Sequence, residues 1–213
     1  MNRIEHREEK WEFPFVEYSP ENMGGEKLPL IIQLHGAGER GCGGQLLNLV
    51  DVHGFSHILK EKDYPCIAVM PQCPKDTFWV ARIESLILFI EHLIREYPVD
   101  PDRVYLTGLS MGGFGTWFTA MAKPELFAAI APVCGGGMAW NAGLLHMPVW
   151  AFHGAEDPVV NPRNSDEMVE KLRSIGADVT YTRVEGVKHN VWENAYTEEL
   201  LEWLLSKKKG ETR

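Results

Sequence analysis

The residues best suited to chemistry lie in one short stretch, Gly108-Leu109-Ser110-Met111-Gly112-Gly113. An apolar run at residues 104–107 precedes this stretch, and a helical pattern at residues 114–121 follows it. A serine on a sharp turn between a strand and a helix has a sparsely allowed backbone conformation, so its neighbours must lack bulk. The glycines two places before and after the serine meet this need, and Gly113 lets the helix approach the sheet closely. The pattern therefore predicts that Ser110 is a nucleophile.

A G-x-S-x-G turn between a strand and a helix is typical of the α/β-hydrolase fold, in which a serine, an acid and a histidine follow one another along the chain. The acid normally follows a later strand, which we expect at residues 148–152. Of the eight histidines in the sequence, only His189 lies further downstream with room for an acid between. Its setting is a loop between a strand and a helix, and a loop can deliver an imidazole to the serine. We therefore expect His189 to be the catalytic base.

Two carboxylates, Glu156 and Asp157, follow the strand expected at residues 148–152. The acid must accept a hydrogen bond from the histidine, which fixes the tautomer and stabilises the imidazolium that forms. The spacing His153-Gly154-x-x-Asp157-x-x-Val160 matches a recurrent block of this fold, so we expect Asp157 to take this role. Glu156 is expected to point elsewhere, as a solvated or structural charge.

Backbone N–H groups are expected to stabilise the oxyanion that forms when the serine attacks a carbonyl group. One donor should be Met111, the residue after the nucleophile. The other should come from the glycine-rich loop after the first buried strand, either from Ala37 or, as the alternative, from Gly38. His35 and His153 each precede a glycine at a strand end, and we assign both to structure, satisfied by nearby backbone.

Taken together, these features resemble the phospholipase/carboxylesterase group of α/β-hydrolases, in particular its feruloyl-esterase-like members and relatives known as predicted peptidases. The blocks that carry the resemblance are His35-Gly36-Ala37-Gly38-Glu39-Arg40-Gly41, Gly108 to Gly113, His153-Gly154-Ala155-Glu156-Asp157 and His189-Asn190-Val191-Trp192. The first block differs from the H-G-G-G of the hormone-sensitive-lipase branch, which argues against long-chain lipid substrates. The resemblance implies ester hydrolysis through an acyl-enzyme, with Ser110, Asp157 and His189 as the triad. This chemistry needs no metal and no organic cofactor.

Trp192 and Trp79 are candidates to line an apolar or aromatic acyl site. Each has a structural alternative, because Trp192 can pack its helix against the histidine loop and Trp79 begins an amphipathic helix. We therefore expect a serine carboxylesterase acting on small or aromatic esters. A peptidase or thioesterase is the alternative, because amide and thioester hydrolysis use the same triad. A non-enzymatic binding protein is disfavoured because competent side chains fill all three triad positions.

Apolar strand patterns and amphipathic helix patterns alternate along the chain. We expect strands at residues 28–34, 66–70, 104–107, 128–133, 148–152 and 179–184, an edge strand at 11–18, and helices within 45–59 and at 79–97, 114–121, 165–175 and 191–205. This alternation predicts a mostly parallel central sheet with helices on both faces. We find no internal repeat, no convincing linker and no room for a large cap domain. Residues 1–213 are therefore expected to form a single α/β-hydrolase domain with an open site.

The net charge of -9 argues against nucleic acid or an anionic membrane as a partner, which leaves a small-molecule ester. The four cysteines contain no C-x-x-C pair, and we expect free thiols rather than a Cys66–Cys73 bridge. Residues 1–10 are charged and lack the apolar core of a signal peptide, and no stretch approaches the length of a membrane span. A cytoplasmic protein is therefore expected. The sequence does not indicate its oligomeric state.

Overall fold

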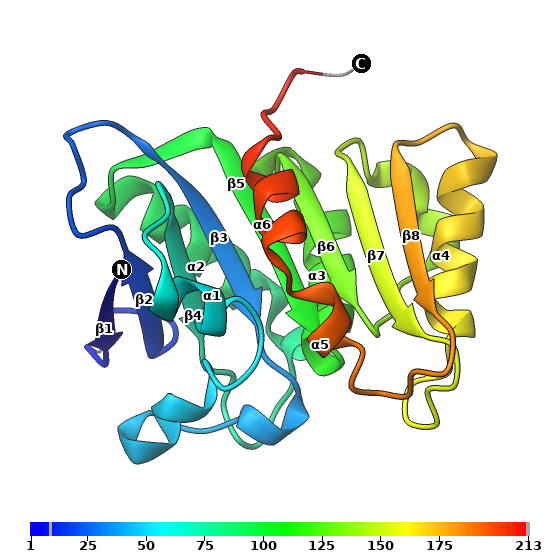
Figure 1. The fold of residues 1–213 in the computed structure, drawn as a ribbon, viewed down its shortest axis with the longest axis horizontal. Coiled ribbons are helices and arrows are strands. Elements are labelled where there is room, and N and C mark those ends of the chain that lie inside the picture. The colour runs from blue at the N-terminus through cyan, green and yellow to red at the C-terminus, as the bar shows by residue number, and fades with distance from the viewer. Residues whose placement is uncertain (9, 212–213) are drawn as a thin grey trace.

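The computed structural model describes residues 1–8 and 10–211, which form an eight-stranded sheet with helices on both faces (Figure 1). The strands are β1 (Asn2–His6), β2 (Phe15–Ser19), β3 (Leu28–Leu34), β4 (Ile67–Pro71), β5 (Val99–Leu109), β6 (Ala129–Val133), β7 (Val149–Gly154) and β8 (Val179–Val184). Their order in the sheet is β1-β2-β4-β3-β5-β6-β7-β8. The strands from β4 to β8 in this order pair in parallel, whereas β1 and β2 pair antiparallel. The predicted mostly parallel α/β fold is confirmed.

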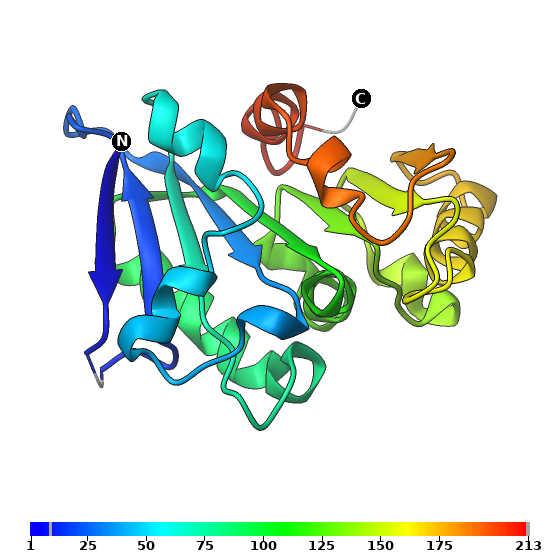
Figure 2. The ribbon, with the colours of Figure 1, turned by 60° about the horizontal axis from the view of Figure 1, so that its bottom comes forward.

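Two apolar layers hold the helices on the sheet. The helices are α1 (Ser56–Glu61), α2 (Ile83–Glu96), α3 (Met111–Ala122), α4 (Arg163–Ser174), α5 (Trp192–Ala195) and α6 (Glu198–Leu205). Along β3, Leu30 and Ile32 join the layer that contains side chains of α2, α3 and α4, while Ile31 joins the layer of α1, α5 and α6. Figure 2 shows the two groups of helices on opposite sides of the sheet. Because both faces are covered, the central strands are apolar at nearly every position.

The expected helix at residues 191–205 is wrong, because the structure has two helices there. Tyr196 leaves the helical conformation with a ψ of 75°, and its buried hydroxyl lies 3.2 Å from that of Thr107. Thr197 then begins α6, with its side chain accepting a hydrogen bond from the N–H of Leu200. Burial of the tyrosine and a new N-cap together outweigh the continuous apolar pattern. The segment within residues 45–59 is likewise divided, into a 3-10 helix (Gly44–Leu49) and α1.

The edge strand expected at residues 11–18 differs from the observed one in its bounds and in its place in the sheet. The strand β2 begins only at Phe15, and β1 lies outside it as the true edge strand. Trp11 and Phe13 precede the strand in a turn, with both rings buried against α2. The sequence of β1 is polar at four of its five positions, and a strand of this kind gives no apolar pattern from which to predict it.

The first turn of α3 lies directly against the backbones of β3 and β6. A Cβ atom on Gly112 would lie 2.2 Å from the carbonyl oxygen of Leu34, and one on Gly113 would lie 2.3 Å from that of Val133. Both distances are far below van der Waals contact, so only glycine permits this packing. The predicted close approach at Gly113 is confirmed. The contact fixes the start of α3, and with it Ser110, relative to two neighbouring strands.

Replacing Gly112 by alanine should lower the free energy of unfolding by about 1–3 kcal/mol, because the helix must move away from a rigid backbone. Urea unfolding followed by circular dichroism measures the change. Gly143→Ala is the matched control, because the nearest atom to its added Cβ is the Ile175 Cδ1 at 3.9 Å. Equal stabilities of the two variants would show that the α3 contact is not a constraint.

Candidate active site

Ser110 joins the end of β5 to the start of α3 in a strained backbone conformation, with φ 54° and ψ -115°. A non-glycine residue in such a region costs on the order of 1–3 kcal/mol and persists only where its surroundings fix it. Here the N–H of Ser110 donates to the carbonyl oxygen of Val133 at 2.9 Å and lies 3.3 Å from the Sγ of Cys134. These contacts with Val133 and Cys134 hold the strained turn, and with it the serine side chain, at the carboxyl ends of the strands.

His189 connects Ser110 to Asp157. Its Nε2 lies 2.9 Å from the Oγ of Ser110, and its Nδ1 lies 2.6 Å from the Oδ2 of Asp157. An ionised carboxylate only accepts hydrogen bonds, so this network assigns the ring proton to Nδ1 and leaves Nε2 to accept from the serine hydroxyl. The structure therefore brings together three residues that the sequence places 79 and 32 positions apart. Glu156, the rejected acid, is exposed to solvent.

The carboxylate of Asp157 is buried and fully hydrogen-bonded. Its Oδ1 accepts the N–H groups of Val159 at 2.8 Å and Val160 at 3.0 Å, while Oδ2 faces His189. Burial by itself raises the pKa of Asp157, but the hydrogen bonds from His189 and the two amides outweigh it and hold the pKa below its ordinary value. The group is therefore an anion at neutral pH, as a partner for an imidazolium must be.

Gly154, the last residue of β7, explains how the histidine loop reaches the acid. A Cβ atom there would lie 2.1 Å from the carbonyl oxygen of Lys188 and 2.5 Å from that of Val187. The N–H of Glu156 also donates to the carbonyl of Val187, at 3.0 Å. The loop before His189 thus rests on the backbone of the acid loop, which places the imidazole beside the carboxylate.

The loop after β3 lies against the other side of the serine turn. Ala37 begins a 3-10 helix (Ala37–Glu39), and Gly36 packs on Leu109, since a Cβ on this glycine would lie 2.9 Å from the Leu109 Cδ1. Within residues 1–8 and 10–211, no group accepts a hydrogen bond from the backbone N–H of Ala37 or of Met111. Both predicted oxyanion donors therefore have an N–H free to bind a ligand.

His35 holds this loop, and the assignment of this histidine to structure is confirmed. Its Nε2 accepts the N–H of Cys73 at 2.9 Å, and its Nδ1 donates to the carbonyl oxygen of Gly36 at 2.6 Å. Burial lowers the pKa of His35 to about 4, so the ring is neutral at neutral pH. A neutral ring with both nitrogens bonded to backbone has no proton to exchange with a substrate.

Trp79 is fully buried, so the expectation that it lines an acyl site is wrong. Its indole N–H donates to the carbonyl oxygen of His35 at 3.0 Å, and this bond attaches the helix start to the loop after β3. Arg40 braces the same loop, with its Nε donating to the carbonyl of Ala37 at 2.9 Å. The sequence contained no signal for the Trp79 bond, because it joins residues 44 positions apart in the chain.

Trp192 occupies a different position, half-buried beside the histidine. Its ring meets that of His189 edge to face, with ring centroids 5.4 Å apart. The ring of His53 lies on it at a tilt, with centroids 5.3 Å apart. In the described part of the chain its indole nitrogen is buried and has no hydrogen-bond partner. These contacts agree with packing against the histidine loop, and a contact with substrate stays a prediction.

One set of potential metal ligands occurs among the described residues, formed by Cys134, Asp157 and His189, with ligand atoms within 4.8 Å of one another. The carboxylate and the imidazole are hydrogen-bonded to each other, and burial raises the pKa of the Cys134 thiol to about 12. A metal would have to displace the proton shared by Asp157 and His189. The described residues thus use these atoms in a hydrogen-bonded chain, and all four cysteines are free thiols, as expected.

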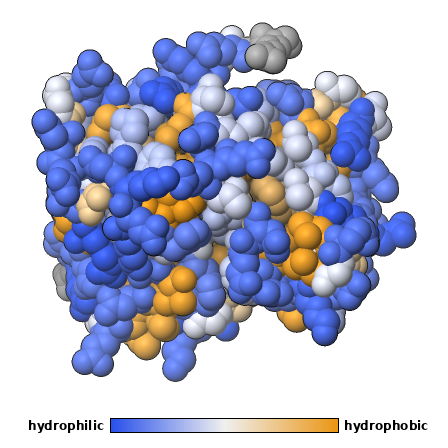
Figure 3. All heavy atoms as spheres, in the orientation of Figure 1, coloured by the Kyte–Doolittle hydropathy of each residue, from blue (hydrophilic) through white to orange (hydrophobic). Residues whose placement is uncertain are grey.

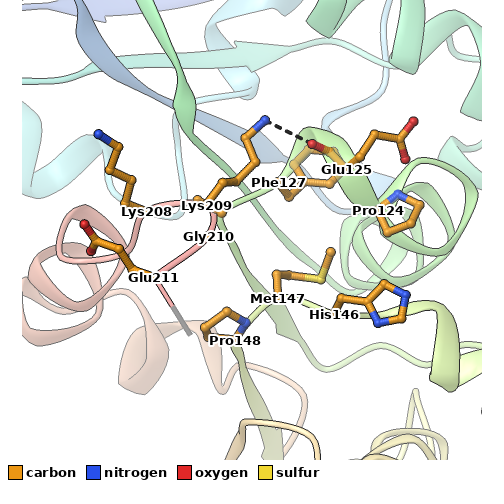
Figure 4. Close-up of a pocket in the computed structure, with 11 residues that line it drawn as sticks. Pro124, Glu125, Phe127, His146, Met147, Pro148, Lys208, Lys209, Gly210 and Glu211 are labelled. Atoms are coloured by element: carbon orange, nitrogen blue, oxygen red, sulfur yellow. Dashed lines mark hydrogen bonds between the residues drawn. The ribbon is translucent and has the colours of Figure 1, made fainter. Parts of the chain in front are cut away.

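A cavity of about 430 Å³ lies at the amino-terminal ends of the strands, on the side of the sheet opposite to Ser110 (Figure 4). Its walls include Phe127 and Pro148, which precede β6 and β7, together with the segment after α6. In this segment Lys209 donates to the carbonyl oxygen of Glu125 at 3.0 Å. Ser110 follows the carboxyl end of β5, so the cavity is separated from it by the length of the strands.

Comparisons with known proteins identify the family of the chain. The family model described as Phospholipase/Carboxylesterase matches residues 64–202. A bifunctional acetylxylan esterase/xylanase of Neocallimastix patriciarum is 30% identical over 162 residues, which cover 73% of this chain and 23% of that protein. Feruloyl esterase B of Neurospora crassa is 31% identical over 137 residues, 59% of this chain and 45% of that protein.

Among solved structures, a thermostable esterase is 33% identical and superposes with a TM-score of 0.83, over 98% of this chain and 63% of that chain. The chain spans between 23% and 59% of the length of the four curated relatives described by these comparisons. The family match extends from the residues before β4 into α6 and includes the serine, the acid and the histidine. The chain belongs to the phospholipase/carboxylesterase family of α/β-hydrolases.

Proposed function

We propose that the chain is a serine carboxylesterase that acts through an acyl-enzyme, with Ser110 as nucleophile, His189 as base and Asp157 as acid. The observation that supports the proposal is the continuous hydrogen-bonded chain from the Ser110 Oγ through His189 to the Asp157 carboxylate, with distances of 2.9 and 2.6 Å. A hydroxyl in contact with a neutral imidazole, itself held by a buried anion, is the arrangement that activates serine for attack on a carbonyl.

In the proposed reaction, the Ser110 Oγ bonds to the ester carbonyl carbon while its proton passes to the Nε2 of His189. Asp157 stabilises the imidazolium, and the N–H groups of Met111 and Ala37 donate to the oxyanion. The carbon–oxygen bond to the alcohol then breaks, and His189 returns the proton to the leaving oxygen. Water next gives a proton to His189 while its oxygen bonds to the acyl carbon. The bond between this carbon and the Ser110 Oγ then breaks, His189 returns the proton to Oγ, and the carboxylic acid is released.

The proposed substrates are small or aromatic carboxylic esters. The relatives named acetylxylan esterase and feruloyl esterase favour a small or an aromatic acyl group, and Trp192 beside the base offers an aromatic surface. Figure 3 shows mostly hydrophilic residues on the face that carries α1, α5 and α6, with apolar residues in separate patches. None of the helices in residues 1–8 and 10–211 is long and apolar enough to cross a membrane. A cytoplasmic location and a single domain stay predictions.

The variant Asp157→Asn should lower kcat on p-nitrophenyl acetate by about three to four orders of magnitude, because the imidazolium loses its anionic partner. Glu156→Gln, one residue earlier and exposed, is the matched control and should retain its activity. Labelling of Ser110 by a fluorophosphonate, read by mass spectrometry, checks the nucleophile. Near-normal turnover in Asp157→Asn together with loss in Glu156→Gln would move the acid role to Glu156.

Ala37→Pro should lower kcat by roughly two to three orders of magnitude, because proline removes one oxyanion donor. The backbone accepts this change: Ala37 is the first residue of its 3-10 helix, and Gly36 has an extended conformation with φ -77° and ψ -173°. A thermal unfolding curve confirms that the variant is folded. If kcat is unchanged in folded Ala37→Pro, the donor is Gly38.

Rates on three substrates should rank in the order ester, thioester and amide. We expect p-nitrophenyl acetate to give the highest kcat/KM, an acyl thioester a lower one and an aminoacyl anilide the lowest, because the sequence blocks and the relatives indicate ester substrates. Steady-state kinetics with the same protein preparation measure all three. A dominant anilide rate would replace the esterase proposal with a peptidase.

A further inference from the structure

We propose that His153 is a positioning residue for this reaction, which holds the loop of Asp157 so that the carboxylate stays directed at His189. The inference rests on the proposed function. His153 is fully buried at the end of β7, and its Nε2 lies 3.4 Å from the Oδ2 of Asp157. This is the same oxygen that accepts the hydrogen bond from His189. Two imidazoles therefore face one carboxylate oxygen. One of them, His153, precedes Asp157 in the sequence, and the other, His189, follows it.

The hydrogen-bond partners of His153 determine where its proton lies. Nε2 faces the carbonyl oxygen of Val160 at 3.0 Å and the Asp157 Oδ2, and both can only accept. Burial lowers the pKa of His153, so the ring carries a single proton at neutral pH. That proton is therefore on Nε2, and Nδ1 lies 2.7 Å from the Oγ of Ser165.

This proton closes a ring of contacts around the acid. The N–H of Val160 donates to the Oδ1 of Asp157 at 3.0 Å, and its carbonyl oxygen accepts from His153. One residue of the loop is thus held at both ends, by the carboxylate and by a side chain on β7. Without the imidazole, the carbonyl of Val160 loses its partner and the amide that orients Asp157 is free to turn away.

The other nitrogen of His153 ties this ring to the rest of the fold. Ser165, in the first turn of α4, lies 2.7 Å from Nδ1 and also 2.8 Å from the carbonyl oxygen of Gly135. Gly135 packs on the backbone of Gly113 in α3, since a Cβ on it would lie 2.4 Å from the Gly113 carbonyl carbon. Contacts through His153 and Ser165 therefore connect the acid loop to the segment that packs on the helix of Ser110.

Several titratable or charged groups surround His153 and Asp157. They are His189 from the loop after β8, Cys134 directly after β6, Asp166 on α4, and Arg183 on β8. Arg183 is in register with His153 and lies 3.6 Å from Asp166. All of these groups are kept in the substitutions used below. A change in the pH profile therefore reports the loss of the His153 contacts.

The test compares His153→Leu with His153→Gln. In His153→Leu we expect kcat on p-nitrophenyl acetate to fall about 10- to 100-fold, the cost of a slightly misplaced catalytic group, while KM stays the same. The acidic limb of the kcat/KM profile should move to lower pH, because a carboxylate that turns away stabilises the imidazolium of His189 less. His153→Gln offers an amide N–H to Val160 in place of the ring N–H, and should recover most of kcat.

Tyr18→Phe is the control for a lost buried hydrogen bond, because the Tyr18 hydroxyl donates to Asp51 at 2.6 Å. Tyr18 lies on β2, far from the acid loop in the sequence. We expect its kcat and its pH profile to match those of the unmodified protein. If His153→Leu lowers kcat with the acidic limb in place, or moves the limb to higher pH, the positioning role is wrong. Loss of kcat in His153→Gln equal to that in His153→Leu would overturn the role as well.

Nitrogen NMR of the unmodified protein tests the inference without any substitution, and decides it if His153→Leu does not fold. A proton on the Nε2 of His153 at neutral pH supports the ring of contacts, and a proton on Nδ1 with no proton on Nε2 overturns it.

The failure of the proposed function and the failure of the His153 role give different results. Unmodified protein that neither hydrolyses p-nitrophenyl acetate nor is labelled at Ser110 refutes the proposed function. An active protein whose His153→Leu variant behaves normally refutes only the role of His153.

Discussion

The contact between the first turn of α3 and the backbones of β3 and β6 is the constraint on which the rest of the site depends. Gly112 and Gly113 bring the helix closer to the sheet than any side chain would allow. The chain can enter the helix at this distance only through a sharp turn, and Ser110 takes the strained conformation of that turn. The loops after β3 and β7 are then positioned relative to a fixed serine.

Burial of one negative charge is the second requirement of the site. A carboxylate removed from water must be matched by donors, and Asp157 receives two backbone amides on one oxygen and His189 on the other. These donors come from its own loop and from the loop after β8. The charge therefore organises two segments of the chain around itself, and its pKa stays low in spite of burial.

The parallel sheet explains why groups from four separate segments meet. The parallel strands β3, β5, β6, β7 and β8 all have their carboxyl ends on the same side of the sheet, so the loops that follow them lie side by side. Four of these loops meet at the site. The glycine-rich loop follows β3, and Ser110, Asp157 and His189 follow β5, β7 and β8. The loops that lead into the strands and the segment after α6 lie at the amino-terminal ends of the strands. The cavity there is separated from Ser110 by the length of the strands.

Much of the fold could be predicted from local patterns. The strands β3, β6 and β8 and the helices α2, α3 and α4 lie within a few residues of their expected positions, because both faces of the sheet are covered and the apolar periods are strong. The polar edge strand β1 could not be predicted, because its residues pair with β2 without burying an apolar face. The division of the last helix depended on burial of Tyr196, a contact with a strand 89 residues away.

The sequence by itself was enough to propose Ser110, Asp157 and His189 as a triad, because glycine-flanked turns and loop spacings are local properties of the chain. Tertiary structure decided which other groups serve them. Trp79, one of two candidates for an acyl site, is buried and donates to the loop after β3, and His153 lies 3.4 Å from the Asp157 carboxylate. Such roles depend on distances between segments that are remote in sequence, and a distance of this kind exists only once the sheet has formed and both apolar layers are packed.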